Sequence, residues 1–492
     1  MNSTARRGLL AGAAAGLALM GGMELGAGLG LTTLIDALQQ PILATVPGAV
    51  FGFLIDRLQH WGKVIEEISQ LIGMLVALAL LGWAAASASA RGLQHAGWAA
   101  AVPIWVVACL VLFPLAGQGL LGLHEGPGTP VEWLLLAGLY GAILDRNLTA
   151  SVHDPGRRAA LTSLSRWAAV VGIAAIGVTR VPGWVQILAA PPEDEAGRTL
   201  EITPVQHFYV VSKNFQDPTV NAASWSLEVN GMVHAPYQLR YGQLKKLPSV
   251  SEYVTMECIS NPLGGNLMST GKFTGTPLRE LVMRARPKTE AGAVGFHSVD
   301  DYTESISLDQ VMASPEILIV WMLDGQPLPE QHGYPARVLV PGYYGMRSPK
   351  WLNRITLTAA SQGGYWEDEG WDASRPIEIT SRIDVPGDGA VLPPGQTVEI
   401  SGVALAGGGK GIASVEVSTD NGETWKEATL EPTLSHLTWR LWSLDWRPEK
   451  QNSYTLVVRA RDMTGQLQTE QAAGTFPKGS TGWQRIQISV EH

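Results

Sequence analysis

Cysteine is nearly absent from this sequence, since its 492 residues contain only Cys109 and Cys258. Cys109 lies inside an apolar run far from Cys258, so no disulfide framework is expected. The sequence also lacks a zinc-binding pattern, a C-x-x-C-H haem attachment site and an internal repeat of roughly 20 to 50 residues. These absences exclude a small disulfide-stabilised fold, a zinc module, a c-type cytochrome and a repeat protein.

An excess of positive charge is also missing. The formal net charge is -9 at pH 7, whereas a nucleic-acid-binding protein needs a basic face. We therefore expect no nucleic-acid partner.

Long apolar runs are present, and they gather near the N-terminus. Several approach the roughly 20 residues that span a hydrocarbon core. No convincing cleavage site follows the first run and further runs do, so it is not read as a signal peptide. We predict an α-helical membrane anchor over residues 1–190 with about five transmembrane helices, at residues 8–31, 71–90, 97–120, 131–144 and 167–178. Residues 41–54, broken by two prolines, are a candidate sixth, re-entrant or interfacial piece.

The arginines predict the orientation of this anchor. Arg6 and Arg7 precede the first run and place the N-terminus in the cytoplasm by the positive-inside rule. Five crossings then leave Arg91 and Arg146 in the cytoplasm and the loop at 122–130, which has no Lys or Arg, outside it. The large C-terminal part is therefore predicted to lie on the extracytoplasmic side of the cell membrane.

Two features of the anchor have competing explanations. Glu24 lies within the first run, where an ionisable side chain is costly and often functional, although it could simply face another helix. Arg157 and Arg158 resemble a twin-arginine export signal, but the ordinary arginines of a cytoplasmic loop explain them equally. A b-type haem is not expected, because the histidines of this region fall at loops or run ends: His60, His95, His124 and His153.

The composition changes from apolar to mixed across residues 189–198. Short strand-like runs then alternate with turn signals and a few helical pieces such as 278–284, which is typical of an α+β domain over 191–377. From there on only strand-like runs follow, with a hairpin signal at Asp420-Asn421-Gly422. Regular short strands over 378–492 predict an immunoglobulin-like β-sandwich.

Cys258 follows an alternating, strand-like run and precedes the turn-forming sequence Ser-Asn-Pro-Leu-Gly-Gly. A thiol at the end of a strand and beside a glycine-lined loop suits a soft-metal ligand or a nucleophile. A free cysteine, however, often packs as a small hydrophobic residue. Cys258 by itself leaves these three roles open.

Polar clusters accompany Cys258 at residues 206–214, 296–303 and 332–354. The last cluster combines glycines with His332, Arg337, Arg347, Lys350 and Arg354. Guanidinium groups bind phosphates through paired hydrogen bonds and lysine binds them as a point charge, so this cluster suits a phosphate or pyrophosphate. A solvated basic loop is the alternative, since charged side chains are mostly exposed.

Four segments together resemble the sulfite oxidase family of molybdopterin-dependent oxidoreductases. They read T-M-E-C-I-S-N-P-L-G-G (255–265), H-G-Y-P-A-R-V-L-V-P-G-Y-Y-G-M-R-S-P-K-W-L (332–352), G-Y-W-E-D-E-G-W (364–371) and G-I-A-S-V-E-V-S-T-D-N-G-E-T-W (411–425). The resemblance extends over about residues 200–492. The N-terminal unit resembles the anchor of bacterial membrane-bound members by hydropathy alone.

The resemblance implies one molybdenum, held by the dithiolene of one pterin, by oxo or hydroxo groups and by the Cys258 thiolate, a soft ligand suited to such a metal. The residues that match the family's contacts to the pterin and its phosphate are Tyr209, Lys213, Asn214, Ser298, His332, Arg337, Ser348 and Lys350. The C-terminal domain would be a dimerisation module and imply a possible homodimer. No haem domain is attached, so we expect a separate electron carrier, either a cytochrome or a quinone.

Two departures from the family bear on the substrate. Sulfite oxidases carry arginines soon after the cysteine, whereas this chain has Asn261-Pro262-Leu263. They also place a tyrosine beside the metal, and the segment that aligns with it, 319–325, has Trp321 there, so Trp321 joins Cys258 as a predicted catalytic residue. Fewer cationic donors weaken oxyanion recognition, which counts against sulfite as the substrate but not against the cofactor.

We interpret the chain as a membrane-anchored molybdenum oxidoreductase that transfers an oxygen atom to or from a small molecule, with two electrons, outside the cytoplasm. A reductase of sulfoxide-like substrates is the alternative within the same class. A non-catalytic, membrane-tethered binding protein with a degenerate site is the alternative from another class. The presence of Cys258 together with His332, Arg337 and Lys350 argues against that second alternative.

Overall fold

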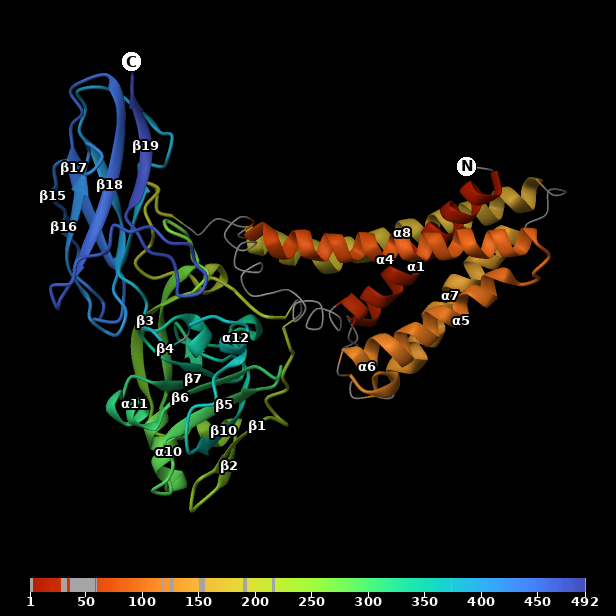
Figure 1. Ribbon diagram of the computed structural model, residues 1–492, viewed down its shortest axis with the longest axis horizontal. Coiled ribbons are helices and arrows are strands. Elements are labelled where there is room, and N and C mark those ends of the chain that lie inside the picture. The colour runs from red at the N-terminus through yellow and green to blue at the C-terminus, as the bar shows by residue number, and fades with distance from the viewer. Residues whose placement is uncertain are drawn as a thin grey trace. The chain divides into compact units, whose positions relative to one another are not determined.

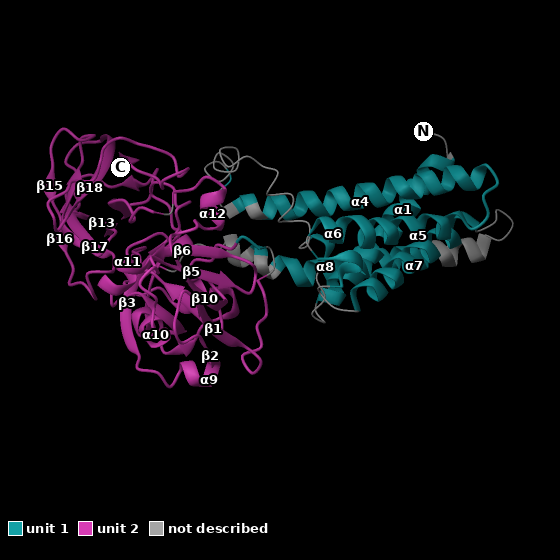
Figure 2. Ribbon diagram, turned by 60° about the horizontal axis from the view of Figure 1, so that its bottom comes forward, with its two compact units in different colours: residues 1–46, 58–189, 213–216 teal, residues 47–57, 190–212, 217–492 magenta. Residues whose placement is uncertain are grey.

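The structure is a computed structural model that describes residues 3–27, 33–35, 58, 60–116, 118–123, 128–149, 155–188, 193–214, 217–372 and 374–491. Residue contacts divide the chain into two compact units (Figure 2). The first unit comprises residues 1–46, 58–189 and 213–216, and the second comprises 47–57, 190–212 and 217–492. The second unit therefore contains most of both domains that were predicted after the anchor.

The described part of the first unit is helical (Figure 1). Its elements are α1 (Ser3–Ala27), α4 (His60–Ala90), α5 (Ala96–Val107), the π-helix η1 (Ala108–Leu112), α6 (Phe113–Leu115), the 3₁₀-helix η2 (Leu120–Gly122), α7 (Gly128–Thr149) and α8 (Pro155–Leu188). Each of the five predicted apolar runs falls largely within a helix. The candidate sixth piece at 41–54 lies outside the described residues.

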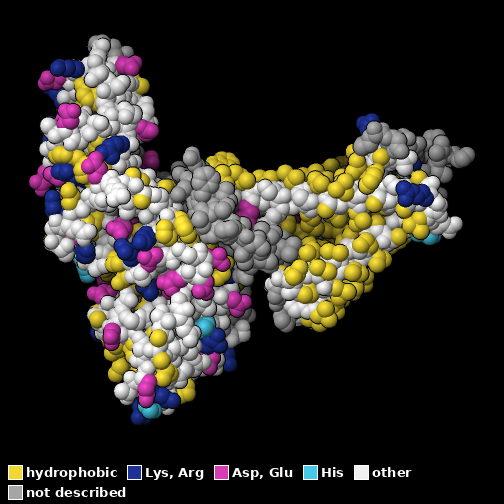
Figure 3. Space-filling model, in the orientation of Figure 1, with side chains coloured by type: hydrophobic (Ala, Val, Ile, Leu, Met, Phe, Trp, Pro, Cys, Tyr) yellow, Lys and Arg dark blue, Asp and Glu magenta, His cyan; other side chains and the backbone are white. Residues whose placement is uncertain are grey.

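Four helical stretches are long and apolar enough to cross a membrane, judged by length and composition: Thr4–Ala27, Val64–Ala90, Ala96–Leu115 and Ser163–Val181. The counterpart of the fourth predicted run, α7, carries Glu132, Asp145 and Arg146 and is not among them. Hydrophobic side chains cover much of the visible face of this unit (Figure 3), with large exposed examples such as Leu80, Val102 and Val171. Apolar surface of this extent marks a contact with a membrane or a protein.

Small residues let α1 approach its neighbours closely, and α1 packs against α4, α7 and α8. A Cβ atom on Gly12 would lie 2.8 Å from the Cα of Gly82 on α4, and one on Gly21 would lie 2.3 Å from the Cα of Gly172 on α8. Glycine at these crossings is therefore required by backbone contact, as in close-packed membrane helices.

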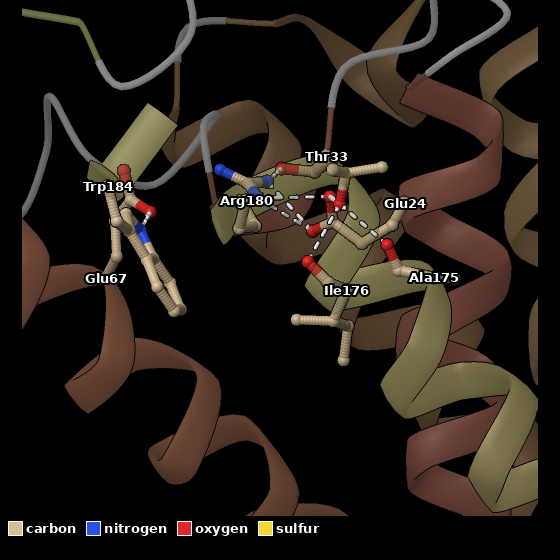
Figure 4. A network of polar contacts seen from close by, with 8 residues as sticks. Glu24, Thr33, Glu67, Ala175, Ile176, Arg180 and Trp184 are labelled. Carbon is tan, nitrogen blue, oxygen red and sulfur yellow. Dashed lines mark hydrogen bonds and ion pairs between the residues drawn. The ribbon is translucent and has the colours of Figure 1, made fainter. Parts of the chain in front are cut away.

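Glu24 is buried between these helices and is ion-paired (Figure 4). The Arg180 guanidinium on α8 donates from Nη2 to Glu24 Oε1 at 2.9 Å and from Nε to Oε2 at 3.0 Å. The Thr179 hydroxyl donates to the same carboxylate at 2.9 Å. In a second polar contact, Trp184 Nε1 donates to Glu67 at 2.6 Å. Of the two explanations for Glu24, the structure shows the one in which it faces another helix.

The first part of the second unit is an α+β domain, as predicted. Its strands are β1 (Ser226–Gly231), β2 (Tyr237–Arg240), β3 (Val250–Glu257), β4 (Met268–Pro277), β5 (Ala293–Ser298), β6 (Thr303–Ser307), β7 (Leu318–Leu323), β8 (Gln326–Pro327), β9 (Arg337–Leu339) and β10 (Leu352–Thr358). One sheet has the order β2-β1-β10-β5-β6, and the other has the order β3-β4-β7-β8 with β9 paired to β7. The β1–β10 pair is parallel and the other pairs are antiparallel.

Short helical elements connect these strands: η3 (Val205–His207), α9 (Tyr241–Leu244), α10 (Leu278–Ala285), α11 (Leu308–Ala313), η4 (Glu330–His332), η5 (Gly345–Arg347) and α12 (Tyr365–Asp368). The helix predicted at 278–284 is α10. It buries Leu278, Leu281, Val282 and Ala285, and this i, i+3, i+4, i+7 spacing forms one face of a helix. The hydrophobic pattern of the sequence therefore explains how α10 covers the core.

The central strand β7 divides the core, because its side chains point alternately to opposite faces. Leu318 and Val320 pack with Phe208 and Met256 in one hydrophobic cluster. Ile319 and Trp321 pack in a separate cluster with residues such as Leu227 and Phe296. The two faces of β7 therefore belong to two different packed layers.

The C-terminal part of the second unit is all β, as predicted. Its strands are β11 (Thr380–Val385), β12 (Val391–Leu392), β13 (Val398–Leu405), β14 (Ile412–Ser418), β15 (Lys426–Glu427), β16 (Thr429–Leu430), β17 (Arg440–Trp446), β18 (Asn452–Asp462) and β19 (Gln484–Val490). They form sheets of order β11-β13-β17-β16 and β12-β19-β18-β14-β15. Ile400 and Trp442 of the first sheet share a core with Val415 and Val458 of the second. The immunoglobulin-like topology stays a prediction.

The hairpin signal in this domain lies where the sequence placed it. Asn421 and Gly422 have φ of 62° and 95°, in the left-handed region that Asn and Gly tolerate best. The Asp420 carboxylate accepts from the backbone N–H of Thr424 at 2.8 Å. The turn connects β14 to β15, which pair antiparallel.

Candidate cofactor site

Cys258 directly follows β3 and is buried. Its backbone N–H donates to the Leu267 carbonyl at 3.0 Å, and its Sγ lies 3.0 Å from the Ser260 hydroxyl. Burial raises the pKa of the Cys258 thiol, and hydrogen bonds with Ser260 oppose that rise. The thiol is thus neutral near neutral pH, and it becomes a strong ligand only when a metal displaces its proton.

Asn261 holds the turn after Cys258 in shape. Its Nδ2 donates to Glu257 Oε1 at 2.9 Å, and its Oδ1 accepts from the Leu267 N–H at 2.9 Å. Its carbonyl accepts from the Ser480 hydroxyl at 2.8 Å. Because the amide is used in these bonds, Asn261 acts as a positioning residue for the cysteine.

Tyr209 lies beside the same turn. Its backbone N–H donates to the Ser269 hydroxyl at 3.0 Å, and Ser269 pairs with Met256 across β3 and β4. Burial raises the pKa of the Tyr209 hydroxyl well above its ordinary value, the nearby Cys258 raises it further, and Arg337 lowers it. The predicted cofactor residue Tyr209 is therefore close to both Cys258 and Arg337.

Arg337, His332 and Ser348 form a second group that joins this one. Arg337 Nη2 donates to the Ser348 carbonyl at 2.7 Å, and Nη1 donates to the His332 carbonyl at 3.3 Å. The Ser348 hydroxyl accepts from the Val340 N–H at 3.0 Å. The His332 ring lies edge-on against Phe208, with ring centres 5.4 Å apart, next to Tyr209 in the chain.

Lys350 completes the basic cluster. Its Nζ donates to the Gln331 carbonyl at 2.9 Å and to the Val211 carbonyl at 3.2 Å. Gly333, with φ of 103°, lies so close that a Cβ there would be 2.9 Å from Lys350 Cβ and 3.1 Å from Arg337 Cβ. A glycine is therefore needed to bring Lys350 and Arg337 together. This part of the cluster is packed rather than a solvated loop, whereas Arg354 is exposed.

Ser298 lies in the same region as the basic cluster, but it belongs to a different sheet from the strand that precedes Cys258. It ends β5 and pairs with Leu352 of β10, while the N–H of the next residue, Val299, donates to the Trp351 carbonyl at 2.9 Å. Ser298 therefore lies beside the segment that carries Lys350. Within the second unit, the structure brings Cys258, Tyr209, Ser298, His332, Arg337, Ser348 and Lys350 into one region.

The charges in this region favour an anion. Burial lowers the pKa of Arg337 to about 10 and that of His332 to about 3, the latter also because Lys350 and Arg337 repel a further positive charge. Near neutral pH the arginine is thus charged and the histidine is a neutral hydrogen-bonding group. Two cations beside a neutral imidazole suit the phosphate of a cofactor.

Unsatisfied polar atoms test whether these residues fit a cofactor. Among the described residues, Ser298 Oγ and His332 Nε2 are buried and have no hydrogen-bond partner. Buried polar atoms in native proteins nearly always have partners, so a bound group is expected to supply them. Both atoms belong to predicted pterin contacts, and a thiol, two cations and free polar atoms together fit a pterin phosphate with a soft metal.

Trp321 is not part of this group. Trp321 lies in the core on the face of β7 opposite to Val320, and Val320 is the residue that pairs with Arg337. Its role at the metal stays a prediction, and its packing favours a structural role. Lys213 and Asn214 belong to the first unit, where Lys213 Nζ donates to Asn214 Oδ1 at 3.0 Å. Their contact with the cofactor also stays a prediction.

Two buried tyrosines near Cys258 were missed from the sequence. The Tyr302 hydroxyl donates to the Met346 carbonyl at 2.7 Å, and the Tyr344 hydroxyl accepts from the Glu378 N–H at 3.3 Å. The Cys258 thiol contributes to the raised pKa of both. Both tyrosines lie inside the polar clusters read from the sequence, but nothing in those clusters singles them out from Tyr343 or Tyr365.

Comparison with known proteins agrees with this geometry. Residues 214–366 match the oxidoreductase molybdopterin binding domain, and residues 372–491 match the Mo-co oxidoreductase dimerisation domain. The mitochondrial sulfite oxidase of Rattus norvegicus is 27% identical over 350 residues, covering 61% of this chain and 64% of that protein. The NADH nitrate reductase of Solanum lycopersicum is 28% identical over 351 residues, covering 59% of this chain and 38% of that protein.

A solved structure has the same fold. The sulfane dehydrogenase SoxCD of Paracoccus pantotrophus aligns with a TM-score of 0.51 and 20% identity over 63% of this chain and 85% of that one. The fold and the matched domains define a molybdopterin-binding oxidoreductase with a dimerisation domain. Its curated relatives include sulfite oxidases and nitrate reductases, and the sulfite oxidases agree with the resemblance seen in the sequence.

Proposed function

We propose that this protein is a membrane-anchored molybdenum oxidoreductase that transfers an oxygen atom with two electrons outside the cytoplasm. The observation that carries the proposal is that the buried Cys258 thiol lies in the same region as the basic cluster. In this region the buried atoms Ser298 Oγ and His332 Nε2 have no hydrogen-bond partner among the described residues. A binding protein with a degenerate site would not be expected to retain buried polar atoms without partners, because such atoms are destabilising unless a bound group pairs with them.

The residues of the site have separate roles in this proposal. Cys258 would bind the molybdenum as a thiolate, and Arg337 and Lys350 would hold the pterin phosphate. Ser298, His332 and Tyr209 would orient the pterin by hydrogen bonds. When bound, the cofactor would supply the two-electron oxygen-atom transfer chemistry, and the protein side chains would bind, orient and shield the reactants.

The helical unit supports the proposed location of the enzyme. Four of its helical stretches have the length and apolarity of membrane spans, and α7, with 22 residues, has a length of about 33 Å that reaches across a hydrocarbon core. With α7 as a fifth crossing, the arginine distribution puts residues 193–491 outside the cytoplasm. Without it, the same residues would lie inside, so the topology of α7 decides the location.

The proposal includes partners for electrons and assembly. A one-electron carrier, a cytochrome or a quinone, would exchange the electrons with the cofactor, and the dimerisation domain at 372–491 would form a homodimer. The chain covers 64% of the rat sulfite oxidase, and its own substrate and electron partner are proposals.

A reductase of sulfoxide-like substrates is the second candidate. Ile259, next to Cys258, packs in a cluster with Trp371 and the partly buried Phe476, whose rings meet edge-to-face at 5.1 Å. Residues 261–263 also supply no cation to bind sulfite. Apolar packing beside the thiol, without added cations, favours a neutral organic substrate over a small dianion.

Metal analysis of the detergent-purified full chain tests the proposal, with wild type beside Cys258→Ser and the matched control Cys109→Ser. Wild type and Cys109→Ser should contain near-stoichiometric molybdenum and pterin, and Cys258→Ser should bind the metal weakly or with an altered spectrum. Folded wild-type protein without molybdenum, made in cells with an intact cofactor pathway, would reject the proposal. Turnover with sulfite and an electron acceptor, against turnover with a sulfoxide and an electron donor, separates the two candidates.

The location has its own test. Impermeant thiol labelling of intact cells, using a cysteine introduced at exposed Ser361 in a Cys109→Ser background, reports the side of the second unit. Labelling before cell lysis is expected, and labelling only after lysis would place the unit in the cytoplasm.

A further inference from the structure

Glu304 is a buried carboxyl group to which the proposed chemistry assigns no role. It lies on β6, its side chain is 1% exposed, and its nearest cation is Arg347, with Nη2 3.9 Å from Oε1. Oε1 accepts from the Ser305 N–H at 2.8 Å, whereas Glu304 Oε2 and Arg347 Nε have no partner among the described residues. A purely structural ion pair would join these atoms directly, so this arrangement leaves the carboxyl free to exchange a proton.

Tyr302 connects Glu304 with the cofactor region. Tyr302 directly precedes β6, and Glu304 is the second residue of that strand. Burial raises the pKa of Tyr302 well above its ordinary value, and Glu304, Asp300 and Cys258 raise it further, so the hydroxyl lies within electrostatic range of Glu304 and of the thiol. The Met346 carbonyl that accepts from this hydroxyl belongs to η5, the turn that also carries Arg347.

The other side of Glu304 leads toward solvent. A Cβ on Gly364 would lie 2.9 Å from Glu304 Oε2, and a Cβ on Gly363 would lie 3.3 Å from Glu367 Oε2. The Ser305 hydroxyl holds this glycine segment against β6, 2.5 Å from the Ser361 hydroxyl and 3.3 Å from the Gly363 carbonyl. Glu367 is half-buried and Ser361 is exposed, so the glycine segment beside Glu304 Oε2 reaches the surface.

We propose that Glu304 transfers protons between the cofactor site and solvent, through the Tyr302 hydroxyl on its inner side and Glu367 on its outer side. The inference rests on the proposed function. Oxidation of a substrate by oxygen-atom transfer from water yields the oxygenated product, two protons and two electrons. The electrons pass to a one-electron carrier, and the protons must leave a buried site. Glu304 takes up each proton as a carboxylate and releases it to Glu367, so that it is unchanged after the cycle.

The charge environment supports this role. Burial raises the pKa of Glu304 to about 7, with Arg347 opposing the rise and Glu367 adding to it. A group that works as both acid and base is most effective when its pKa is near the working pH. In the reductase direction the same residues would carry protons inward.

Three full-chain variants test the proposal: Glu304→Gln, Glu367→Gln and the control Glu228→Gln, an exposed carboxyl on β1 of the same sheet. Each is analysed for molybdenum, for turnover between pH 5 and 9 (about two units either side of the Glu304 pKa), and by infrared difference spectroscopy on reduction. We expect Glu304→Gln to load molybdenum, to be about 100-fold slower, and to lose the carboxylic acid band and the titration near neutral pH. Glu367→Gln should be slowed less, and Glu228→Gln should behave as wild type.

The outcomes separate this inference from the proposed function. Wild-type protein without molybdenum would reject the proposed function, and this inference with it, before any variant is compared. Loaded Glu304→Gln with wild-type turnover, pH profile and infrared bands would overturn the proton route alone. If Glu304→Gln does not fold, Glu367→Gln decides, because its carboxyl is half-buried at the surface end of the route and an unchanged rate there would also overturn it.

Discussion

The Asn261 side chain donates a hydrogen bond to Glu257 at 2.9 Å, across the turn that carries Cys258. Glu257 is buried, and burial raises its pKa to about 7. Its second oxygen has no partner among the described residues, so Asn261 is the side chain that satisfies this carboxyl group. The same amide accepts a hydrogen bond from the backbone N–H of Leu267, and the Leu267 carbonyl in turn accepts one from the backbone N–H of Cys258.

Asn261→Ala should therefore destabilise the second unit by about 2 kcal/mol, since it leaves a buried carboxyl oxygen and a buried N–H without partners. Molybdenum content should fall as well, because the turn that positions Cys258 loosens. Denaturant unfolding of the detergent-solubilised chain measures the first effect and metal analysis the second. Asn452→Ala, at an exposed position, is the control; equal stability of the two variants would refute the role of Asn261.

Gly345→Ala should disturb Tyr209. A Cβ at this position would lie 2.6 Å from the Tyr209 hydroxyl and 3.5 Å from the Glu257 carbonyl, so the ring must move away from the cofactor region. We expect the variant to lose most of its molybdenum, whereas Gly242→Ala, with nothing within 4 Å, should keep it. The double variant Gly345→Ala with Tyr209→Phe makes room for the methyl group, and thermal unfolding should show that it regains stability. If the double variant regained no stability, the methyl group would be clashing with a neighbour other than the Tyr209 hydroxyl.

His332 should make the protein sensitive to acid. Burial holds its pKa at about 3 in the folded chain, below the ordinary value of about 6.5 in the unfolded chain. Its stabilising contribution is therefore complete above about pH 6.5 and declines as the pH falls toward 3, by about 1.4 kcal/mol per pH unit. The unfolding free energy of wild type relative to His332→Phe should decline with this slope between about pH 6 and 5. A flat difference between wild type and His332→Phe over this range would contradict a buried, neutral histidine.

The Glu24–Arg180 pair should behave as a coupled unit. Glu24 is 1% exposed and Arg180 is 10% exposed, so Glu24→Gln or Arg180→Met alone leaves a buried charge and should cost about 3 to 5 kcal/mol. The double variant should be less destabilised than the sum of the two, as determined by a double-mutant cycle on thermal unfolding in detergent. Strictly additive effects would mean that the two side chains do not interact.

Local patterns in the sequence predicted much of the architecture. The apolar runs, the spacing of Leu278, Leu281 and Val282, and the Asp420-Asn421-Gly422 turn each concern residues close together in the chain. Helix period, strand alternation and turn preference depend on such neighbours, which is why these elements lie where they were expected. The resemblance to a family then predicted which polar residues bind the cofactor. The second unit brings most of them together, and their contact with the cofactor stays a prediction.

Relations between distant segments could not be read this way. Whether a β7 side chain faces the cofactor or the core depends on strand register, since a shift of one residue reverses every side chain. The sequence could not show that Trp321 packs in a core cluster, and its role at the metal stays a prediction. The partner of Glu24 lies on a helix far along the chain, and the route through Glu304 depends on a glycine segment that follows another strand. The sequence by itself determined the elements and the chemistry available at Cys258. Only the tertiary structure decided which faces meet, because long-range packing sets burial, pairing and pKa.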